Sequence, residues 1–445
     1  MDERDPENVI ACPGCGEALS GQDEHMFDAE RFGLLRCSCS EYPLVAGIPV
    51  IVRGPLADSN CDSERLCTLI RAGEHKRALI EALAPRQKAP KPHQLTRLLP
   101  SALAARARSA QSRNSRSQWR HRFEMLCQDE SPGSAIRLIR HYFGERYNAA
   151  NYFAFRAGQP KYLITLALSH LTNAADWKLD VGCGAGHITR ILNNSQSSGN
   201  AVGLDRNFFL LWLANTRVAP DARFVCCDAE QGLPFGASAF DFALLSNFYH
   251  FIYQKRLMLA ELKRVGHENS VVVISSLRNR NVITPTPNLA LSPEGYQSLV
   301  DEQFETSTMI SESALLEEIV LKASNEFPRA DSAEALKDEP MINLILTNSP
   351  EFSATDKFRS ANEGAVYRIN PLYRRRPDMR DDMAALAARW PSEQYLEDNP
   401  ELRTYLPDEM HLPAGIVSAL DKHEYVAEME PLVREGVLVD LPASY

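Results

Sequence analysis

The chain has 445 residues, 44% of them hydrophobic, and a formal net charge of −10 at pH 7. This length exceeds what one ordinary hydrophobic core supports, so we expect two or three domains. The negative charge argues against indiscriminate binding to phosphate backbones, and no apolar run reaches the roughly 18 to 20 residues that span a bilayer. The acidic N-terminus also lacks the apolar segment of a secretory signal, so we expect a cytoplasmic protein without a membrane partner.

Residues 1–55 are predicted to form a small zinc-ribbon-like domain. Cys12 and Cys15 are followed about twenty residues later by Cys37 and Cys39. In a reducing compartment, such a cluster indicates a metal site rather than disulfides. Four thiolates suit tetrahedral Zn²⁺ and leave no open coordination position, so the predicted zinc is structural. A degenerate ribbon that folds without metal is the alternative. Residues 42–52 are predicted to form one short strand.

Residues 56–144 are predicted to be a helical and basic linker region. Helical spacing covers residues 61–83, and a Pro- and Lys-rich stretch follows at 85–92. Between Arg71 and Arg122 there are thirteen Lys or Arg residues and two acids, a local charge of +11. This stretch keeps RNA open as an alternative partner, although a solvated helix face would have the same composition.

Residues 145–350 are predicted to form an α/β domain, because short apolar strands alternate regularly with helices. This alternation predicts a mostly parallel, Rossmann-like sheet with helices on both faces. The predicted strands are residues 179–181, 201–205, 223–228, 240–245, 270–275, 306–310 and 341–346. The predicted helices are residues 161–171, 187–192, 208–214 and 256–265.

Residues 351–445 are predicted to be a C-terminal extension. They carry many charges, prolines and aromatic residues without a strong period. We leave its role open between a cap over an acceptor site, a dimer arm and a small helical module. A homo-oligomer is therefore one option for the assembly. Residues 367–376 combine Tyr and Arg side chains that could bind an anionic acceptor.

The first predicted strand of the α/β domain ends in a glycine-rich turn, Asp180-Val-Gly182-Cys183-Gly184-Ala-Gly186. Glycines let the backbone turn sharply and bring a ligand close where a Cβ would collide. The spacing is G-x-G-x-G rather than the G-x-G-x-x-G of dinucleotide sites. We therefore expect a ligand that needs close backbone approach more than a phosphate site.

Three further strand ends carry polar residues at the same edge of the sheet, where ligands bind in this architecture. Asp205 ends the second strand, and its carboxylate can accept hydrogen bonds from both hydroxyls of a ribose. Asp228 ends the third strand and can accept from an adenine amino group. Asn247 follows the fourth strand and is predicted to bind acceptor or cofactor. Their neighbours Arg206, Ala229 and Ser246 are predicted to contribute to the same site.

With these motifs in this order, residues 150–350 resemble the class I S-adenosylmethionine-dependent methyltransferases. The stretch Leu179–Gly186 resembles their first motif, and Asp205 matches their ribose-binding acid. Residues 227–235 are similar to their adenine-side motif, as it is written in the ubiquinone-biosynthesis-like, small-molecule branch. The resemblance implies bound S-adenosylmethionine and transfer of its methyl group. One departure lies at residues 264–270, where that branch usually has Pro-Gly-Gly.

Methyl transfer requires an acceptor lone pair in line with the methyl group and a site without water. A proton must also leave when the acceptor is a hydroxyl or a protonated amine. We predict that His250, or Tyr249 through a water, serves as the general base. A role in lining the pocket or in packing is the alternative for both.

The cysteine segment, including residues 42–50, resembles the small zinc-ribbon proteins that activate tRNA, rRNA and release-factor methyltransferases. This resemblance implies a stabilising or acceptor-recruiting module fused to the enzyme.

We favour methyl transfer to an O or N nucleophile of a small molecule or peptide in a biosynthetic pathway. An rRNA or tRNA methyltransferase is the alternative, because a zinc ribbon also precedes the methyltransferase domain in an rRNA guanine methyltransferase family and the basic linker could follow phosphates. That linker lacks the interleaved aromatics that stack on bases. A non-catalytic binding module is the third option. Intact Asp180, Gly184, Asp205 and Asp228 argue against it.

Overall fold

The computed structural model describes residues 10–27, 30–86, 117–144, 148–169, 171, 176–194, 200–283, 288–322, 324, 330–348, 365–376 and 383–445. Most of the basic stretch between Arg71 and Arg122 lies outside the described residues, as does the Pro- and Lys-rich stretch after its first two residues. None of the helices in these ranges is long and apolar enough to cross a membrane.

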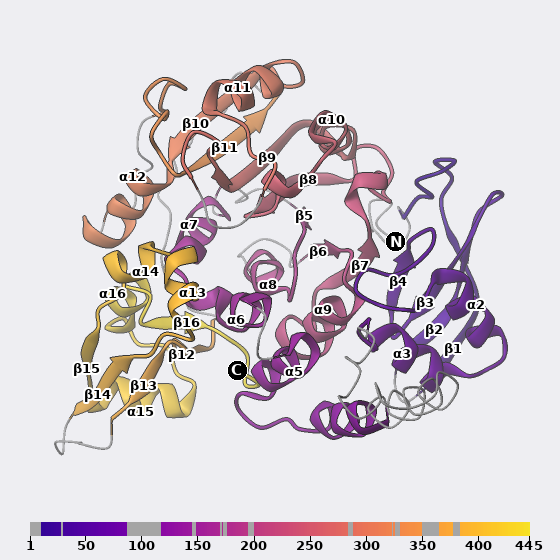
Figure 1. Cartoon of the computed structure of the whole chain (residues 1–445), viewed down its shortest axis with the longest axis horizontal. Coiled ribbons are helices and arrows are strands. Elements are labelled where there is room, and N and C mark those ends of the chain that lie inside the picture. Colours follow the sequence, from indigo (N-terminus) through magenta and orange to yellow (C-terminus); the bar gives the residue numbers. More distant parts are fainter. Residues whose placement is uncertain are drawn as a thin grey trace, which may run out of the picture.

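An 11-stranded sheet runs through the described part of the chain, in the order β1-β2-β3-β4-β7-β6-β5-β8-β9-β11-β10 (Figure 1). Its parallel centre confirms the predicted strands, and two antiparallel strands extend it beyond β9. The parallel strands are β5 (Trp177–Val181), β6 (Asn200–Asp205), β7 (Arg223–Cys227), β8 (Phe240–Ser246) and β9 (Gly266–Arg278). The antiparallel strands are β10 (Thr306–Ser311) and β11 (Met341–Thr347).

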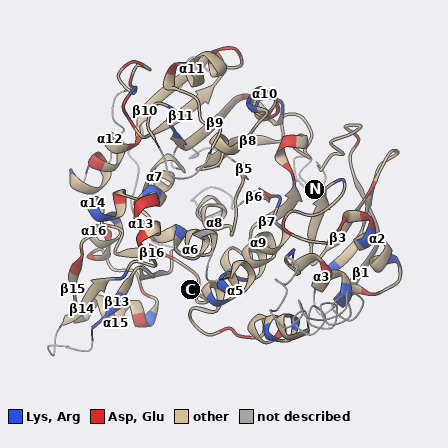
Figure 2. Ribbon diagram, viewed as in Figure 1, with Lys and Arg blue, Asp and Glu red and all other residues tan. Residues whose placement is uncertain are grey.

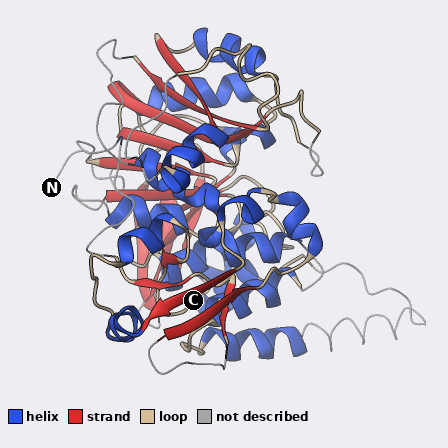
Figure 3. Cartoon of the chain, turned by 90° about the vertical axis from the view of Figure 1, so that its left-hand side faces the viewer, coloured by secondary structure: helices blue, strands red, loops and turns tan. Residues whose placement is uncertain are grey.

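Helices cover both faces of this sheet, which confirms the predicted α/β class. Successive side chains of a strand point to opposite faces of the sheet. In β8, Leu244 packs into one hydrophobic cluster and Leu245 into another. The first cluster includes residues of α7, α8 and α9, and the second includes residues of α10 and α11. Figure 3 shows strands of the large sheet with helices packed beside them. These helices are α7 (Pro160–Ser169), α8 (His187–Asn194), α9 (Phe208–Leu213), α10 (Lys255–Val265) and α11 (Pro293–Asp301).

The cysteine segment folds as an antiparallel ribbon that continues the central sheet. Its strands are β1 (Ser20–Phe27), β2 (Glu30–Arg36), β3 (Glu41–Val45) and β4 (Ile48–Ile51). β4 pairs in parallel with β7, with Val50 opposite Cys226. Residues 42–52 thus form a hairpin rather than the single predicted strand. The reason is the turn at Ala46 and Gly47, whose φ angles of 51° and 75° reverse the chain direction.

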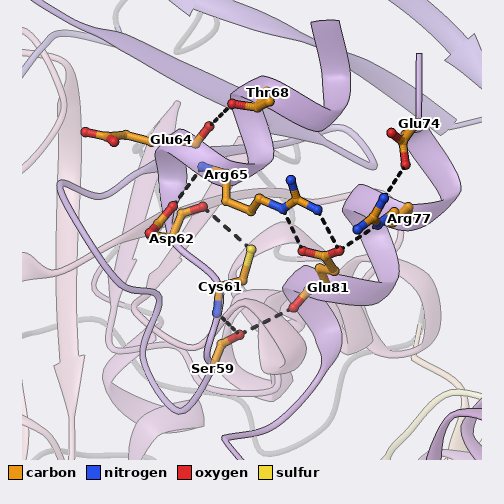
Figure 4. A network of polar contacts seen from close by, with 9 residues as sticks. All are labelled: Ser59, Cys61, Asp62, Glu64, Arg65, Thr68, Glu74, Arg77 and Glu81. Carbon is orange, nitrogen blue, oxygen red and sulfur yellow. Dashed lines mark hydrogen bonds and ion pairs between the residues drawn. The ribbon is translucent and has the colours of Figure 1, made fainter. Parts of the chain in front are cut away.

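Residues 61–83 form two helices where the spacing predicts one helical stretch. α2 (Ser63–Arg71) ends before Gly73, whose φ of 71° is left-handed and interrupts the helix, and α3 (His75–Leu83) follows. Figure 4 shows how polar contacts join the two helices. The Glu81 carboxylate accepts hydrogen bonds from Arg65 Nε at 3.1 Å and Arg77 Nε at 2.8 Å.

The helices that precede the parallel sheet lie beside its central strands. A helix covers residues 117–127, and α5 (Ser134–Phe143), α6 (Asn148–Phe155) and α7 follow. A further helix, α12 (Glu312–Leu316), follows β10 and packs on α7. Charged residues are spread over the outer helices (Figure 2).

The C-terminal extension packs around a third hydrophobic cluster and lies beside α6 and α7 (Figure 1). Two small sheets support it, one of β12 and β16 and one of β13, β14 and β15. The strands are β12 (Tyr367–Ile369), β13 (Tyr373–Arg375), β14 (Met383–Ala388), β15 (Glu409–Pro413) and β16 (Leu438–Asp440). The helices are α13 (Glu393–Asp398), α14 (Glu401–Tyr405), α15 (Ala414–Lys422) and α16 (Met429–Arg434).

Candidate functional site

Two adjoining cavities lie at the carboxyl ends of the parallel strands. The first has a volume of about 210 Å³ and the second about 510 Å³. Both are lined by Gly182, Asp205, Phe248 and Phe251, so the two cavities adjoin at these residues.

The glycine-rich turn forms the floor between the two cavities. The φ angles of Gly182, Gly184 and Gly186 are 76°, 54° and 78°, which L side chains rarely adopt. A Cβ on Gly182 would lie 2.6 Å from Phe248 Cγ. The amides of Gly182 and Cys183 donate to the Leu204 carbonyl at 2.7 and 3.0 Å, which fixes the turn to the end of β6. Of the five turn residues predicted to bind cofactor, Gly182 lines the cavities, Cys183, Gly184 and Gly186 shape the turn around it, and Asp180 does not line a cavity.

Asp180 lies behind this turn rather than in a cavity. Its side chain is buried and accepts a hydrogen bond from Thr189 Oγ1 at 2.7 Å. Burial raises the pKa of Asp180 to about 7. The contact joins the end of β5 to the first turn of α8. Asp180 therefore positions the glycine-rich turn and does not line a cavity.

Asp205 lines both cavities, as its predicted role requires. One carboxylate oxygen accepts from the Gly184 amide at 3.0 Å and the other from the Asn207 amide at 2.8 Å. Burial raises the pKa of Asp205. Each oxygen can accept a second hydrogen bond, so the carboxylate can still bind two hydroxyls. Its neighbour Arg206 is exposed and lines the first cavity.

The first cavity combines apolar walls with a hydrogen-bond acceptor at its edge. Ala229, Phe248 and Ile252 supply apolar surface, and the Asp228 carboxylate also lines the cavity. Asp228 accepts a hydrogen bond from the Glu230 amide at 3.2 Å, which starts a short 3-10 turn. A flat ring with an amino group fits this combination.

The second cavity contains Ser246 and Asn247 at the end of β8. Ser246 Oγ accepts from Arg156 Nη2 at 2.9 Å. Asn247 has a φ of 53°, and its Nδ2 donates to the Tyr152 hydroxyl at 3.1 Å. Asn247 Oδ1 is buried without a hydrogen-bond partner among the described residues. The amide oxygen is therefore available to a ligand.

Several residues of the second cavity come from outside the strand-end motifs. Tyr152, Phe153 and Lys161 belong to the helices before β5, and Arg278 ends β9. The C-terminal extension adds residues of α13 and the turn after it, namely Gln394, Tyr395, Asp398 and Asn399. The edge rule that identified Asp205 and Asp228 would also have identified Arg278, because it ends a parallel strand. No sequence signal points to α13.

Tyr249 and His250 do not line either cavity, where we predicted them. The Tyr249 side chain is fully buried, and its hydroxyl donates to the Lys255 carbonyl at 3.0 Å. His250 is also fully buried, and burial together with nearby cationic side chains lowers its pKa to about 3. The short helical turn at Tyr249–Phe251 directs these two side chains into the core and leaves Phe251 at the cavities.

The four predicted metal ligands come together in the N-terminal ribbon. The Sγ atoms of Cys12, Cys15, Cys37 and Cys39 all lie within 4.8 Å of one another. Three Sγ–Sγ distances are 3.7, 3.6 and 3.6 Å. Zn–S bonds of about 2.3 Å in a tetrahedron place sulfurs about 3.8 Å apart, so the cluster fits Zn²⁺. Arg53 Nη2 lies 3.8 Å from Cys39 Sγ and 4.0 Å from Cys12 Sγ.

The Tyr- and Arg-rich segment at 367–376 lies away from both cavities. Tyr367 and Tyr373 are buried in the third hydrophobic cluster. Arg376 forms an ion pair with Glu409. This segment therefore supports the C-terminal extension and lines neither cavity.

The parallel part of the sheet is similar in sequence to a known protein family. Residues 179–274 match the family model of a methyltransferase domain. The comparison with curated proteins found no match. The matched segment contains the turn and the ends of β5, β6, β7 and β8, which line the two cavities.

Three of the similar solved structures are the following. One is a complex of the Haloferax volcanii Trm112 methyltransferase activator with a putative methyltransferase (17% identity, 46% of this chain and 98% of that chain, TM-score 0.33). Another is the plantazolicin methyltransferase BpumL with S-adenosylhomocysteine (14% identity, 52% and 100%, TM-score 0.36). The third is a TehB-like methyltransferase from Corynebacterium glutamicum (16% identity, 41% and 88%, TM-score 0.29).

Proposed function

We propose that this chain, an enzyme with a methyltransferase domain at residues 179–274, transfers the methyl group of S-adenosylmethionine to an O or N nucleophile of a small molecule or peptide. The observation that carries the proposal is the meeting of the two cavities at Gly182 and Asp205. One cavity suits a nucleoside, and the other is open to a second ligand. The backbone passes between them without a side chain at Gly182.

Different residues of the first cavity would bind different parts of the cofactor. Asp228 and Ala229 would hold the adenine, and Asp205 would accept from the ribose hydroxyls. Gly182 would let the remainder of the cofactor pass toward the second cavity. When bound, S-adenosylmethionine supplies an electrophilic methyl group, so the protein has to bind, orient and exclude water.

The second cavity supports an acceptor of modest size. Its volume of about 510 Å³ lies within the range of small-molecule sites. The aromatic side chains of Tyr152, Phe153 and Tyr395 surround it and would exclude water from the reacting atoms. We propose that the reaction belongs to a biosynthetic pathway. The general base stays a prediction at His250 or Tyr249, although neither lines the cavity.

We also propose that the four cysteines bind one structural Zn²⁺. The S–S distances support this, and four thiolates would complete the coordination. Such a centre carries a net charge of −2, and the Arg53 guanidinium beside two of the sulfurs would offset part of it. The ribbon would then act as a stabilising module at the β7 edge of the sheet.

The test is transfer of labelled methyl from S-adenosylmethionine into a fractionated extract of the host. We expect label in a low-mass or peptide fraction, and S-adenosylhomocysteine should bind the purified protein in calorimetry. Gly182→Val should abolish both results, because its Cβ would collide with Phe248. Gly415→Ala is the matched control, since nothing lies within 4 Å of its added Cβ. Label in RNA alone would contradict the acceptor class, and no binding of S-adenosylhomocysteine would contradict the cofactor.

A further inference from the structure

The second cavity contains a buried cation that no described acid pairs with. Arg278 is the last residue of β9, is 7% exposed, and lines the cavity. Its Nε has no hydrogen-bond partner, and no ion pair joins its guanidinium to an acid in the described part of the chain. A buried charge without a partner is costly. Accordingly, burial lowers the pKa of Arg278.

The other cations near this cavity already have partners. Lys161 Nζ lies 3.2 Å from Glu401 Oε1, and both side chains are largely buried. Arg156 donates to Ser246 Oγ at 2.9 Å and to Gln159 Oε1 at 3.3 Å. Arg278 thus differs from its neighbours, because its Nε has no hydrogen-bond partner and its guanidinium forms no ion pair among the described residues.

The acids around the cavity do not take this place. Asp205 lies at the junction with the first cavity and is held by two backbone amides. Glu401 is already paired with Lys161. Asp398, on α13, also lines the cavity and, like Glu401, acts on Arg278 through its charge, without an ion pair to Arg278 among the described residues. An Arg guanidinium offers several donors in a planar fork, which matches a carboxylate or a phosphate.

Aromatic side chains form one part of the cavity wall. Tyr152, Phe153, Phe248 and Tyr395 surround its interior. Phe251 lines it too and is 41% exposed, so it stands at the opening. These aromatic side chains suit an apolar body. Polar side chains also line the cavity, namely those of Lys161, Asp205, Ser246, Asn247, Arg278, Gln394, Asp398 and Asn399.

We propose that Arg278 binds an anionic group, a carboxylate or a phosphate, of the methyl acceptor, and that the acceptor is a small acid with an apolar body. This inference rests on the proposed function, because it assigns the second cavity to the acceptor. Arg278 is a specificity-determining residue in this arrangement. It holds the acceptor by its anionic end and leaves the nucleophile free to face the junction at Gly182.

The test titrates two anionic probes and one neutral probe of similar shape into the protein saturated with S-adenosylhomocysteine. The probes are phenylacetate, phenyl phosphate and 2-phenylethanol. We expect one anion to bind at least about tenfold more tightly than the alcohol, since a charge-assisted hydrogen bond is worth that much. The stronger anion distinguishes a carboxylate acceptor from a phosphate acceptor. Arg278→Gln should remove the advantage, and Arg278→Lys should retain part of it.

Arg280→Gln is the matched control, because Arg280 is exposed and lies two residues further along the chain. It should bind all probes as the wild type does. The affinity for S-adenosylhomocysteine should stay within about twofold in all three variants, which separates anion recognition from misfolding. Two results would overturn the inference: equal or absent binding of anions and alcohol by the wild type, or undiminished anion binding by Arg278→Gln. A failure of the proposed function appears elsewhere, as no binding of S-adenosylhomocysteine alone.

Discussion

At the scale of single residues, Asp205 occupies the most consequential position, because it faces both cavities. Its carboxylate accepts hydrogen bonds from two backbone amides and can accept further hydrogen bonds from a ligand. The same contacts hold the glycine turn and the start of α9 in place. Ligand binding and local order are thus combined in one side chain.

We expect Asp205→Ala to weaken binding of S-adenosylhomocysteine by about 1–3 kcal/mol, because charge-assisted hydrogen bonds to the ribose are lost. Isothermal titration calorimetry measures this change. Asp205→Asn keeps one acceptor oxygen and should lose less. Asp221→Ala, at an exposed acid before β7, is the control and should bind as the wild type does. Unchanged affinity in Asp205→Ala would remove Asp205 from the site.

His250 makes the stability of the protein depend on pH. Its pKa is about 3 in the folded chain, against about 6.5 when unfolded. Below pH 6.5 the His250 side chain therefore takes up a proton in the unfolded chain and stays neutral in the folded chain. This contribution to stability is present above pH 6.5 and is lost as the pH falls toward 3.

At pH 5 the loss amounts to about 2 kcal/mol for this one residue. We expect His250→Leu to narrow the difference in unfolding free energy between pH 7.5 and pH 5 by that amount, as measured with urea. His187, whose pKa is also about 3, keeps its own share of the difference. The exposed His121 serves as control, and His121→Gln should show the wild-type pH dependence. An identical difference in His250→Leu would refute the burial argument.

At the scale of elements, the pairing of β4 with β7 connects the cysteine cluster to the cofactor side. Val50 and Ile51 lie opposite Cys226 and Cys227, and the residues after β7 line the first cavity. The N-terminal segment also bridges Ile10 to Phe235. A change at the cysteine cluster should therefore reach the first cavity.

We expect one zinc per chain by metal analysis, and its loss in Cys39→Ser because three thiolates bind zinc more weakly than four. Loss of zinc should lower the thermal unfolding temperature and weaken S-adenosylhomocysteine binding, since the β7 edge loses its support. Cys127→Ser, at a half-buried cysteine outside the cluster, should keep the metal. A folded protein that never contains metal would contradict this prediction.

Elements with a strong local period were predictable, and their interruptions were less so. The parallel strands and the helices between them follow from apolar periodicity. The break between α2 and α3, and the hairpin at residues 46–47, depend on left-handed backbone at Gly73, Ala46 and Gly47. Glycine permits such a conformation without requiring it, so composition alone did not place these turns.

At the scale of the whole molecule, the C-terminal extension is fastened to the methyltransferase domain by polar contacts. Arg190 Nη2 of α8 lies 3.0 Å from Asp440 Oδ1 of β16, and both side chains are 14% exposed. Asn370 Nδ2 donates to the Gly158 carbonyl at 3.0 Å. These contacts join the extension to the helices on either side of β5, and α13 of the same extension lines the second cavity.

We expect Asp440→Asn to reduce the unfolding free energy by about 1–3 kcal/mol, between the values for exposed and fully buried ion pairs. The reason is that Arg190 keeps its charge and loses its partner. Denaturant unfolding provides the measurement. Asp421→Asn is the control, because Asp421 is 68% exposed and 3.9 Å from Arg375. It should change stability by less than about 0.5 kcal/mol. Equal effects in the two variants would mean that the Arg190 pair is not a fastening contact.

The sequence by itself determined the parallel α/β sheet, the glycine turn with Asp205 and Asp228 at its edge, and the grouping of four cysteines. Each of these features depends on the local spacing of residues, which is a property of the sequence alone. Only the tertiary structure decided that β4 joins β7, that α13 closes the second cavity, that Arg278 faces into it and that His250 is buried. These outcomes depend on contacts between segments far apart in the chain. A local period shows which residues are apolar, but it does not show which distant surface will cover them.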